Sequence, residues 1–413
     1  MALAVVVFAV TYIAIASRSL HHVLKLERPG AAICGGVLMV VVGALRLDDA
    51  LAAIDLHVLV LLFGVLVIAA YLSDAGFFKL AAYLVLTRAR TAKRLLIGLV
   101  FVAGGLSALL LNDTVCVVLT PLVVIVVVEA KLPPLPYLIG LAAAANVGGV
   151  VSFSGNPQNM IVGAAAHDQI SFAHYLILTL PAGVACLAID AWLIGLMFEL
   201  PDGNLIEREL ERPELDTALA IKALVALAVF AVLALFGFVL AGAAMVAACA
   251  LILASRRGAK KAFESVDWPL LVFFAGLFVV VAGIQHVGLV DKAFHALEPV
   301  IARGDWLGDV AFIALIVIGS QLVSNVPIAV IAVAWVPHMP DPKWGYVMLA
   351  VASTLAGTLT PLGSVANIIV MEAAGEHGHI GFWKFLKYGL VITLANCAVA
   401  FAILGTERWL GAL

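Results

Sequence analysis

Charged side chains are scarce in this sequence. Only 12% of its 413 residues are Asp, Glu, Lys or Arg, whereas 64% are hydrophobic. A soluble domain carries about 25% charged residues, so the composition excludes a soluble protein and indicates an all-α polytopic protein of the lipid bilayer. The sequence also lacks a basic patch with interleaved aromatic residues, so nucleic-acid binding has no support.

Paired cysteines and hydrolytic motifs are missing as well. Intramembrane hydrolases need HExxH, a pair of acids or a Ser-His set, and the sequence has none of them. We therefore predict that the protein is not an enzyme and needs no cofactor. The cysteines form no CxxC pair and lie in apolar runs, which predicts neither a disulfide nor a structural metal: Cys34, Cys116, Cys186, Cys249 and Cys397.

Apolar runs of spanning length alternate with polar interruptions. A span needs about 20 mostly apolar residues, and the runs predict about ten transmembrane helices. Residues 1–200 make a first half, 201–216 a cytoplasmic linker and 217–413 a second half. Each half contains two runs with a polar centre. We interpret these as a re-entrant hairpin (95–128 and 306–337) and a broken helix (137–166 and 346–374).

Matching residues at a fixed offset indicate that the second half repeats the first. The offset is 212 residues up to the polar tips of the hairpins and 208 residues in the broken helices. It pairs Asp55 with Asp267, Asn112-Asp113 with Ser324-Asn325, Gly149 with Gly357, Gly155 with Gly363 and Asn159 with Asn367. Because this offset aligns both tips and both breaks, we predict an internal repeat.

The distribution of positive charge predicts the orientation. With the N-terminus outside, 18 of the 23 Lys and Arg residues fall on the cytoplasmic side and five outside. Five spans per half then give the halves opposite orientation, as in secondary transporters built from inverted repeats. We expect a multi-pass protein of the inner membrane with both termini outside.

The first tip places a carboxylate, Asp113, between two apolar arms. A charge at the bilayer centre costs about 2.5–3.5 kcal/mol on insertion scales, and it is tolerated where it is protonated or faces water or a cation. We hypothesise that Asp113 couples transport to H⁺ or Na⁺, with Asn112 and Thr114 as neutral oxygen ligands. The alternative is that it only caps the next helix. Whether Asp190 and Cys116 take part stays open.

The breaks are the second candidate region, since Pro and Gly interrupt a helix there. Unwound backbone at membrane depth survives only where it is buried in protein or lines a cavity; a simple proline kink is the alternative. With the second tip, the candidate binding residues are Ser154, Gly155, Asn156, Gln158, Asn159, Ser324, Asn325, Thr358, Thr360, Gly363, Ser364 and Asn367.

No Lys or Arg lies in the core of a predicted span. An anionic substrate would therefore have no basic side chain waiting for it. Its charge would be met by helix N-termini or by bound cations, whereas a neutral hydroxylated substrate would avoid the problem.

These motifs resemble the ion-transporter superfamily over about residues 56–404. That group includes divalent-anion:sodium symporters, citrate transporters, arsenite/antimonite efflux permeases and sodium/proton antiporters. Asn112-Asp113 with Leu119-Thr120-Pro121 is similar to the first tip of the arsenite permeases, and Pro361-Leu362-Gly363-Ser364 to their second break. Gly155-Asn156-Pro157-Gln158-Asn159 is similar to a bacterial branch of anion permeases.

The resemblance implies an elevator-type secondary transporter. It suggests a homodimer for the symporters only, so the oligomeric state of this chain stays open. In the symporters both tips read Ser-Asn-Thr and line sodium and carboxylate sites, so Na⁺ at the tips is one expectation. Here an acid, Asp113, enters the first tip and Val326 replaces the second hydroxyl. This favours arsenite or antimonite efflux by proton exchange. The alternatives are a cation-coupled permease for dicarboxylate, citrate or sulfate-like anions, a sodium/proton antiporter, or a passive channel.

Overall fold

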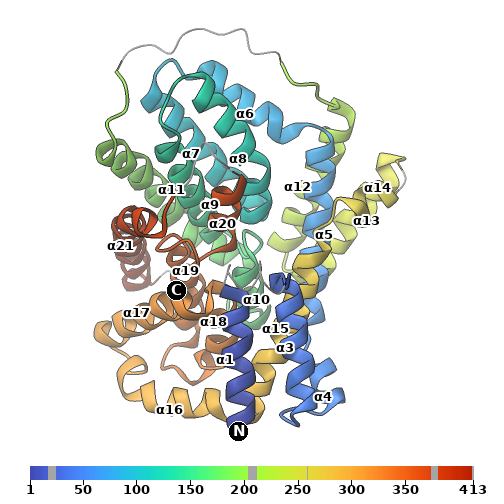
Figure 1. The fold of residues 1–413 in the computed structure, drawn as a ribbon, viewed down its shortest axis with the longest axis vertical. Coiled ribbons are helices and arrows are strands. Elements are labelled where there is room, and N and C mark those ends of the chain that lie inside the picture. Colours follow the sequence, from blue (N-terminus) through green and yellow to red (C-terminus); the bar gives the residue numbers. More distant parts are fainter. Residues whose placement is uncertain (17–24, 203–211, 258, 374–379, 412–413) are drawn as a thin grey trace.

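The computed structural model describes residues 1–16, 25–202, 212–257, 259–373 and 380–411 (Figure 1). These residues form helices and connecting turns without a β-strand. Eight of the described helices are long and apolar enough to cross a membrane. The prediction of an all-α, multi-pass membrane protein is confirmed, whereas the number of ten spans stays a prediction. Most of the predicted linker, residues 203–211, lies outside the described residues.

The first half contains ten described helices. They are α1 (Ala2–Ala16), α3 (Arg28–Val41), α4 (Leu47–Ala52), α5 (Leu56–Asp74), α6 (Phe77–Arg88), α7 (Ala92–Leu109), α8 (Asn112–Glu129), α9 (Pro134–Val150), α10 (Pro157–Ala165) and α11 (Phe172–Met197). The polar interruptions of the sequence therefore fall between α7 and α8 and between α9 and α10, where they were expected.

The second half follows the same order. Its described helices are α12 (Thr217–Leu235), α13 (Leu240–Ser255), α14 (Ala259–Glu264), α15 (Trp268–His286), α16 (Leu289–Ile301), α17 (Trp306–Val323), α18 (Asn325–Val333), the 3₁₀ turn η1 (Val336–His338), α19 (Pro342–Ala356), α20 (Val365–Ala373) and α21 (Phe382–Trp409). Some helices at matching positions have equal length: α5 and α15 have 19 residues each, and α10 and α20 have nine, whereas α8 has 18 and α18 has nine. The inverted orientation of the halves stays a prediction.

Helices of the two halves interlock rather than forming separate bodies. α3 packs along α15 and α13 along α5, while α10 contacts α18 and α19, and α20 contacts α8 and α9. Close approach at the first of these pairs needs a glycine, because a Cβ at Gly276 would lie 2.6 Å from the carbonyl carbon of Ala32. The broken helices consequently meet at the centre of the molecule (Figure 1).

Two features of the fold differ from a simple reading of hydropathy. The first two apolar runs form helices of only 15 and 14 residues, α1 and α3, which are shorter than a full span. α16 was not expected, because charged residues interrupt its sequence. It forms because Val290, Phe294 and Ile301 lie on one buried face.

Asp55 and Asp267 each precede an apolar run in the sequence, and in the structure their side chains cap α5 and α15.

Candidate functional site

The fold brings the two polar tips and the two breaks around one small central cavity. Six of the predicted site residues line it: Asn112, Asp113, Gln158, Ser324, Asn325 and Ser364. The others form the buried wall behind it, namely Ser154, Gly155, Asn156, Asn159, Thr358, Thr360, Gly363 and Asn367. Only Thr114 stands apart, half-buried and outside the cavity lining. Four segments far apart in the sequence therefore share one site.

Each break is held open by one asparagine whose amide donates to two backbone carbonyls. Asn159 Nδ2 donates to the carbonyl oxygens of Gly149 (2.8 Å) and Ser152 (3.3 Å). Asn367 Nδ2 donates to those of Gly357 (2.6 Å) and Thr360 (2.9 Å). These are equivalent positions at the 208-residue offset. The amides replace the helical partners that unwinding removes, so the breaks are built structures rather than proline kinks.

Two further polar residues join the breaks across the halves. Thr354 Oγ1 donates to Asn159 Oδ1 (3.0 Å) and accepts from Asn156 Nδ2 (3.0 Å). Asn146 Nδ2 donates to Asn367 Oδ1 at 3.1 Å. Neither Thr354 nor Asn146 was among the binding residues predicted from the sequence. The sequence does contain one sign that links these two residues, because the 208-residue offset pairs Asn146 with Thr354.

The first tip is anchored to the first break. The N–H of Asn112 donates to the carbonyl oxygen of Gly155 (3.1 Å), and its side-chain amide donates to Asn146 Oδ1 (3.4 Å). Asp113 sits in the first turn of α8, but the N-cap position is Leu111 and no side chain caps the helix. Helix capping by Asp113, the alternative left open by the sequence, is therefore wrong.

The Asp113 carboxylate lies between two helix N-termini. It belongs to the first turn of α8 and lies close enough to the backbone N–H of Ala366, in the first turn of α20, for the two to interact electrostatically. The unpaired N–H groups of a helix start carry partial positive charge, so they attract an anion or a carboxylate. Asp113 is thus placed where a proton, a cation or an anionic substrate would each change the local charge.

The turn at the second tip has a less favourable backbone conformation than the turn at the first. Ser324 connects α17 to α18 with a φ of 72°, a left-handed conformation that a non-glycine residue adopts only at a cost. Gln321, in the last turn of α17, supports this turn. Its Nε2 donates to the carbonyl oxygen of Ala356 (2.9 Å), and its Oε1 accepts from Thr360 Oγ1 (2.8 Å). Gln321 was missed by the sequence interpretation, and it ties the second tip to the second break.

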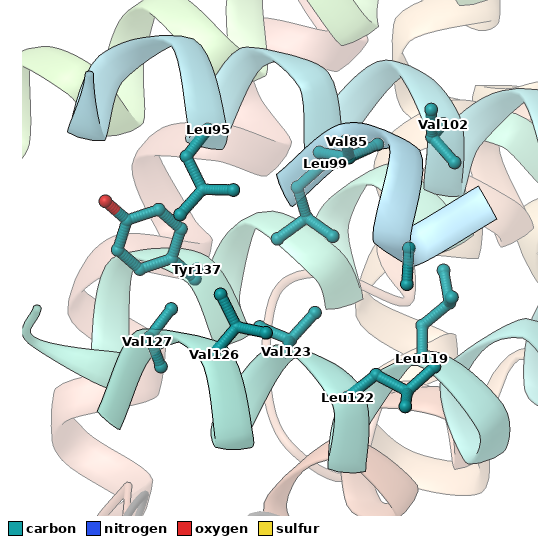
Figure 2. Close-up of a pocket in the computed structure, with 11 residues that line it drawn as sticks. Val85, Leu95, Leu99, Val102, Leu119, Leu122, Val123, Val126, Val127 and Tyr137 are labelled. Carbon is teal, nitrogen blue, oxygen red and sulfur yellow. The ribbon is translucent and has the colours of Figure 1, made fainter. Parts of the chain in front are cut away.

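A separate apolar cavity of about 380 Å³ lies between the arms of the first hairpin, α6 and α9 (Figure 2). Figure 2 shows leucine and valine side chains from these helices, with Tyr137 at one end. The Tyr137 hydroxyl donates to the carbonyl oxygen of Ala92 (3.1 Å). This cavity offers no polar group for an ion, so the candidate site is the central cavity. In the described part of the chain, no cluster of three His, Cys, Asp or Glu residues could hold a metal.

Asp190 lies elsewhere, in the contact between α11 and α21. It is fully buried, and its Oδ1 accepts a hydrogen bond from Asn396 Nδ2 at 2.8 Å. Within the described residues, Asp190 Oδ2 and Asn396 Oδ1 have no hydrogen-bond partner. A proton on Asp190 Oδ2 would supply the missing donor. The pair joins the last long helices of the two halves and does not line the central cavity.

We expect Asp190→Asn to retain fold and transport, because Asn is neutral and of similar size. Asn396→Ala removes the bond, and it should destabilise the protein by about 0.6–1.7 kcal/mol, the range for side-chain hydrogen bonds between membrane helices. Thermal melting of the purified variants, together with a transport assay, checks both. A well-folded Asp190→Asn protein without transport would contradict this structural assignment.

Comparison with known proteins places the chain among transporters. Residues 12–346 match the family model described as Citrate transporter. The chain is 30% identical to a silicon efflux transporter of Oryza sativa subsp. japonica, over 92% of this chain and 93% of that protein. It is 23% identical to a Dictyostelium discoideum relative bearing the transporter name arsB, over 90% of this chain and 86% of that protein.

A solved structure shares the fold. The YdaH transporter of Alcanivorax borkumensis superposes with a TM-score of 0.57, covering 96% of this chain and 90% of that chain. Its sequence is 16% identical, so the likeness concerns the fold.

Proposed function

The chain belongs to the citrate transporter family of secondary transporters, and we propose that it exports a small inorganic oxyanion or its neutral hydroxide in exchange for protons. Arsenite and antimonite are the favoured substrates. The observation that carries the proposal is the Asp113 carboxylate in a cavity whose described lining contains no Lys or Arg. Such a site can release or take up a proton at the same place where a small substrate binds.

The proposed cycle uses the tips and the breaks as one site. A proton on Asp113 and the substrate occupy the central cavity in turn, and the cavity faces the two sides of the membrane alternately, as in an elevator. The silicon efflux relative supports a hydroxide substrate, because silicon and arsenite both dissolve mainly as neutral hydroxides near neutral pH. We further propose an inner-membrane location with both termini outside and a homodimeric assembly.

A cation-coupled anion permease is the second candidate. The family description supports it, and so do two buried hydroxyls without a partner among the described residues, Ser107 Oγ and Thr358 Oγ1. Neutral oxygens of this kind are ligands for Na⁺. Labelled citrate or sulfate uptake that requires Na⁺ would favour this function, and salt-sensitive growth rescue without an anion would favour sodium/proton antiport.

Arsenite accumulation in an arsenite-sensitive bacterial host tests the first proposal. We expect cells that express the protein to hold several-fold less arsenic than cells with an empty vector, because export opposes passive entry. Atomic absorption of washed cells gives the measurement. Equal accumulation in both strains, with the protein present in the membrane, would remove arsenite as a substrate.

A further inference from the structure

A second, small cavity adjoins the central one on the side of α1 and α3, and four of its eleven lining residues are polar. The two cavities share four lining residues: Phe273, Ser324, Pro327 and Val365. The second cavity adds Tyr12 from α1, Arg28 from the start of α3, and Gln321 from the end of α17. The second hairpin tip thus borders both spaces, because Ser324 and Pro327 line each of them.

Arg28 is the basic residue that the sequence did not place near the tips. It precedes an apolar run in the sequence, but α3 begins at this residue and the fold sets it beside the second tip. Its charge is close enough to Asp113 for the two to interact. No Lys or Arg is among the described residues that line the central cavity, whereas Arg28 lines the space next to it, where the sequence predicted no basic side chain.

The buried hydroxyl of Tyr12 is a second observation that favours a ligand in this cavity. Its side chain is only 6% exposed, and its hydroxyl has no hydrogen-bond partner among the described residues although it lines this cavity. A buried hydroxyl without a partner is costly. A ligand oxygen in the cavity would accept from it. The amide of Gln321 is already used, since it donates to the carbonyl oxygens of Val317 and Ala356.

The equivalent place in the other half carries no positive charge. The 212-residue offset sets Leu240, at the start of α13, in the position of Arg28, and Leu61 in the position of Phe273. Both line a larger, open crevice, whose described lining has two acids, Asp55 and Asp168, two histidines, His57 and His167, and no Lys or Arg. The two sides of the molecule therefore differ in charge, with the cation on the side of α1 and α3.

We propose that Arg28 and Tyr12 form a binding subsite for a small inorganic oxyanion, next to the central cavity and on its loading side. This inference rests on the proposed export function. It concerns the oxyanion members of the proposed substrate class, for which arsenate is the probe, and not the neutral hydroxide arsenite. The guanidinium supplies charge and paired N–H donors to the oxyanion, and the Tyr12 hydroxyl adds one donor. In the predicted topology this cavity faces the cytoplasm, where an exporter must capture its substrate.

Arsenate and arsenite make a matched pair of probes, because at pH 7 arsenate is an anion and arsenite is neutral. Binding to the purified full-length protein in nanodiscs is measured by calorimetry. We expect Arg28→Gln to weaken arsenate binding about tenfold or more and to change arsenite binding less than twofold. Arg28→Lys should recover part of the arsenate affinity, and Tyr12→Phe should lose less than Arg28→Gln.

Arg303→Gln is the control, since Arg303 is an exposed arginine paired with Asp305 and lies before the start of α17, at the opposite end of this helix from Gln321. Unchanged arsenate affinity in a folded Arg28→Gln protein would overturn the subsite, as would an absence of arsenate binding by the wild type. Arsenite export in cells is scored separately. Lost export with intact Arg28-dependent binding would refute the proposed function and leave the subsite standing.

Exchanging the residues at the two equivalent positions, Arg28 and Leu240, tests on which side of the membrane the subsite lies. In oriented proteoliposomes, Arg28→Leu should raise the KM for arsenate on the α1–α3 side at unchanged maximal rate. Adding Leu240→Arg should lower the KM on the opposite side. If Arg28 had a purely structural role, Arg28→Leu would lower the transport rate from both sides, and adding Leu240→Arg would not lower the KM on the opposite side. That result would contradict the proposal.

Discussion

Asp113→Asn is expected to abolish proton-driven export while substrate exchange continues. Asn matches the protonated acid in size but cannot release a proton, so the driving force no longer reaches the substrate. With the membrane potential clamped, a difference of one pH unit supplies about 1.4 kcal/mol per proton. That supports about a tenfold arsenite gradient for one-to-one exchange. We expect wild-type proteoliposomes to build this gradient and the variant to build none, measured with radiolabelled arsenite.

Asp49→Asn is the matched control, because Asp49 also lies in the first turn of a helix but is exposed. It should behave as wild type. If Asp113→Asn still accumulates arsenite against its gradient when a pH difference is imposed, Asp113 is not the coupling residue. Loss of counterflow exchange as well would show that the residue is needed for binding.

Gly155→Ala is expected to destroy the site through sterics alone. A Cβ at this position would lie 2.7 Å from the Gly149 Cα, 2.8 Å from the Gly149 oxygen and 2.9 Å from the Ser107 oxygen. All three are backbone atoms of α9 and α7, so no side chain can rotate away. We expect a loss of about 1–3 kcal/mol of stability, typical of overpacking, and no measurable arsenite exchange in proteoliposomes.

Gly105→Ala provides the comparison, since a Cβ on this glycine of α7 would meet no atom within 4 Å. Its melting temperature and exchange rate should match the wild type. Normal exchange by Gly155→Ala would mean that the contact between the first break and α7 is looser than the structure has it, and it would argue against a rigid tip cavity.

Much of this architecture follows from local sequence. Apolar length predicts membrane helices, and Pro157 at the start of α10 and the Gly363-Ser364 pair before α20 mark where helices stop and restart. The tip residues Asn112, Asp113, Ser324 and Asn325 were identified because polar groups in an apolar run need a local reason. The structure gathers all four around one cavity.

The missing residues are those whose role depends on long-range packing. Thr354 and Asn146 look like ordinary polar residues of a helix, and only the crossing of the two halves sets them against Asn159 and Asn367. Arg28 is similar: hydropathy places it at a span end, and only the packing of α3 along α15 brings it beside the second tip. Hydropathy contains no information about such neighbours, and the 208-residue offset pairs Asn146 with Thr354 without showing what either residue contacts.

Proton movement driven by arsenite tests the central claim most directly. Purified protein is reconstituted with a pH-sensitive dye inside the vesicles, and an outward arsenite gradient is applied without any pH gradient or membrane potential. If transport is proton exchange, arsenite leaving the vesicles carries protons inward, and the lumen acidifies in the wild type but not in Asp113→Asn. Arsenite efflux without a change in lumenal pH, or efflux that requires Na⁺, would contradict the account.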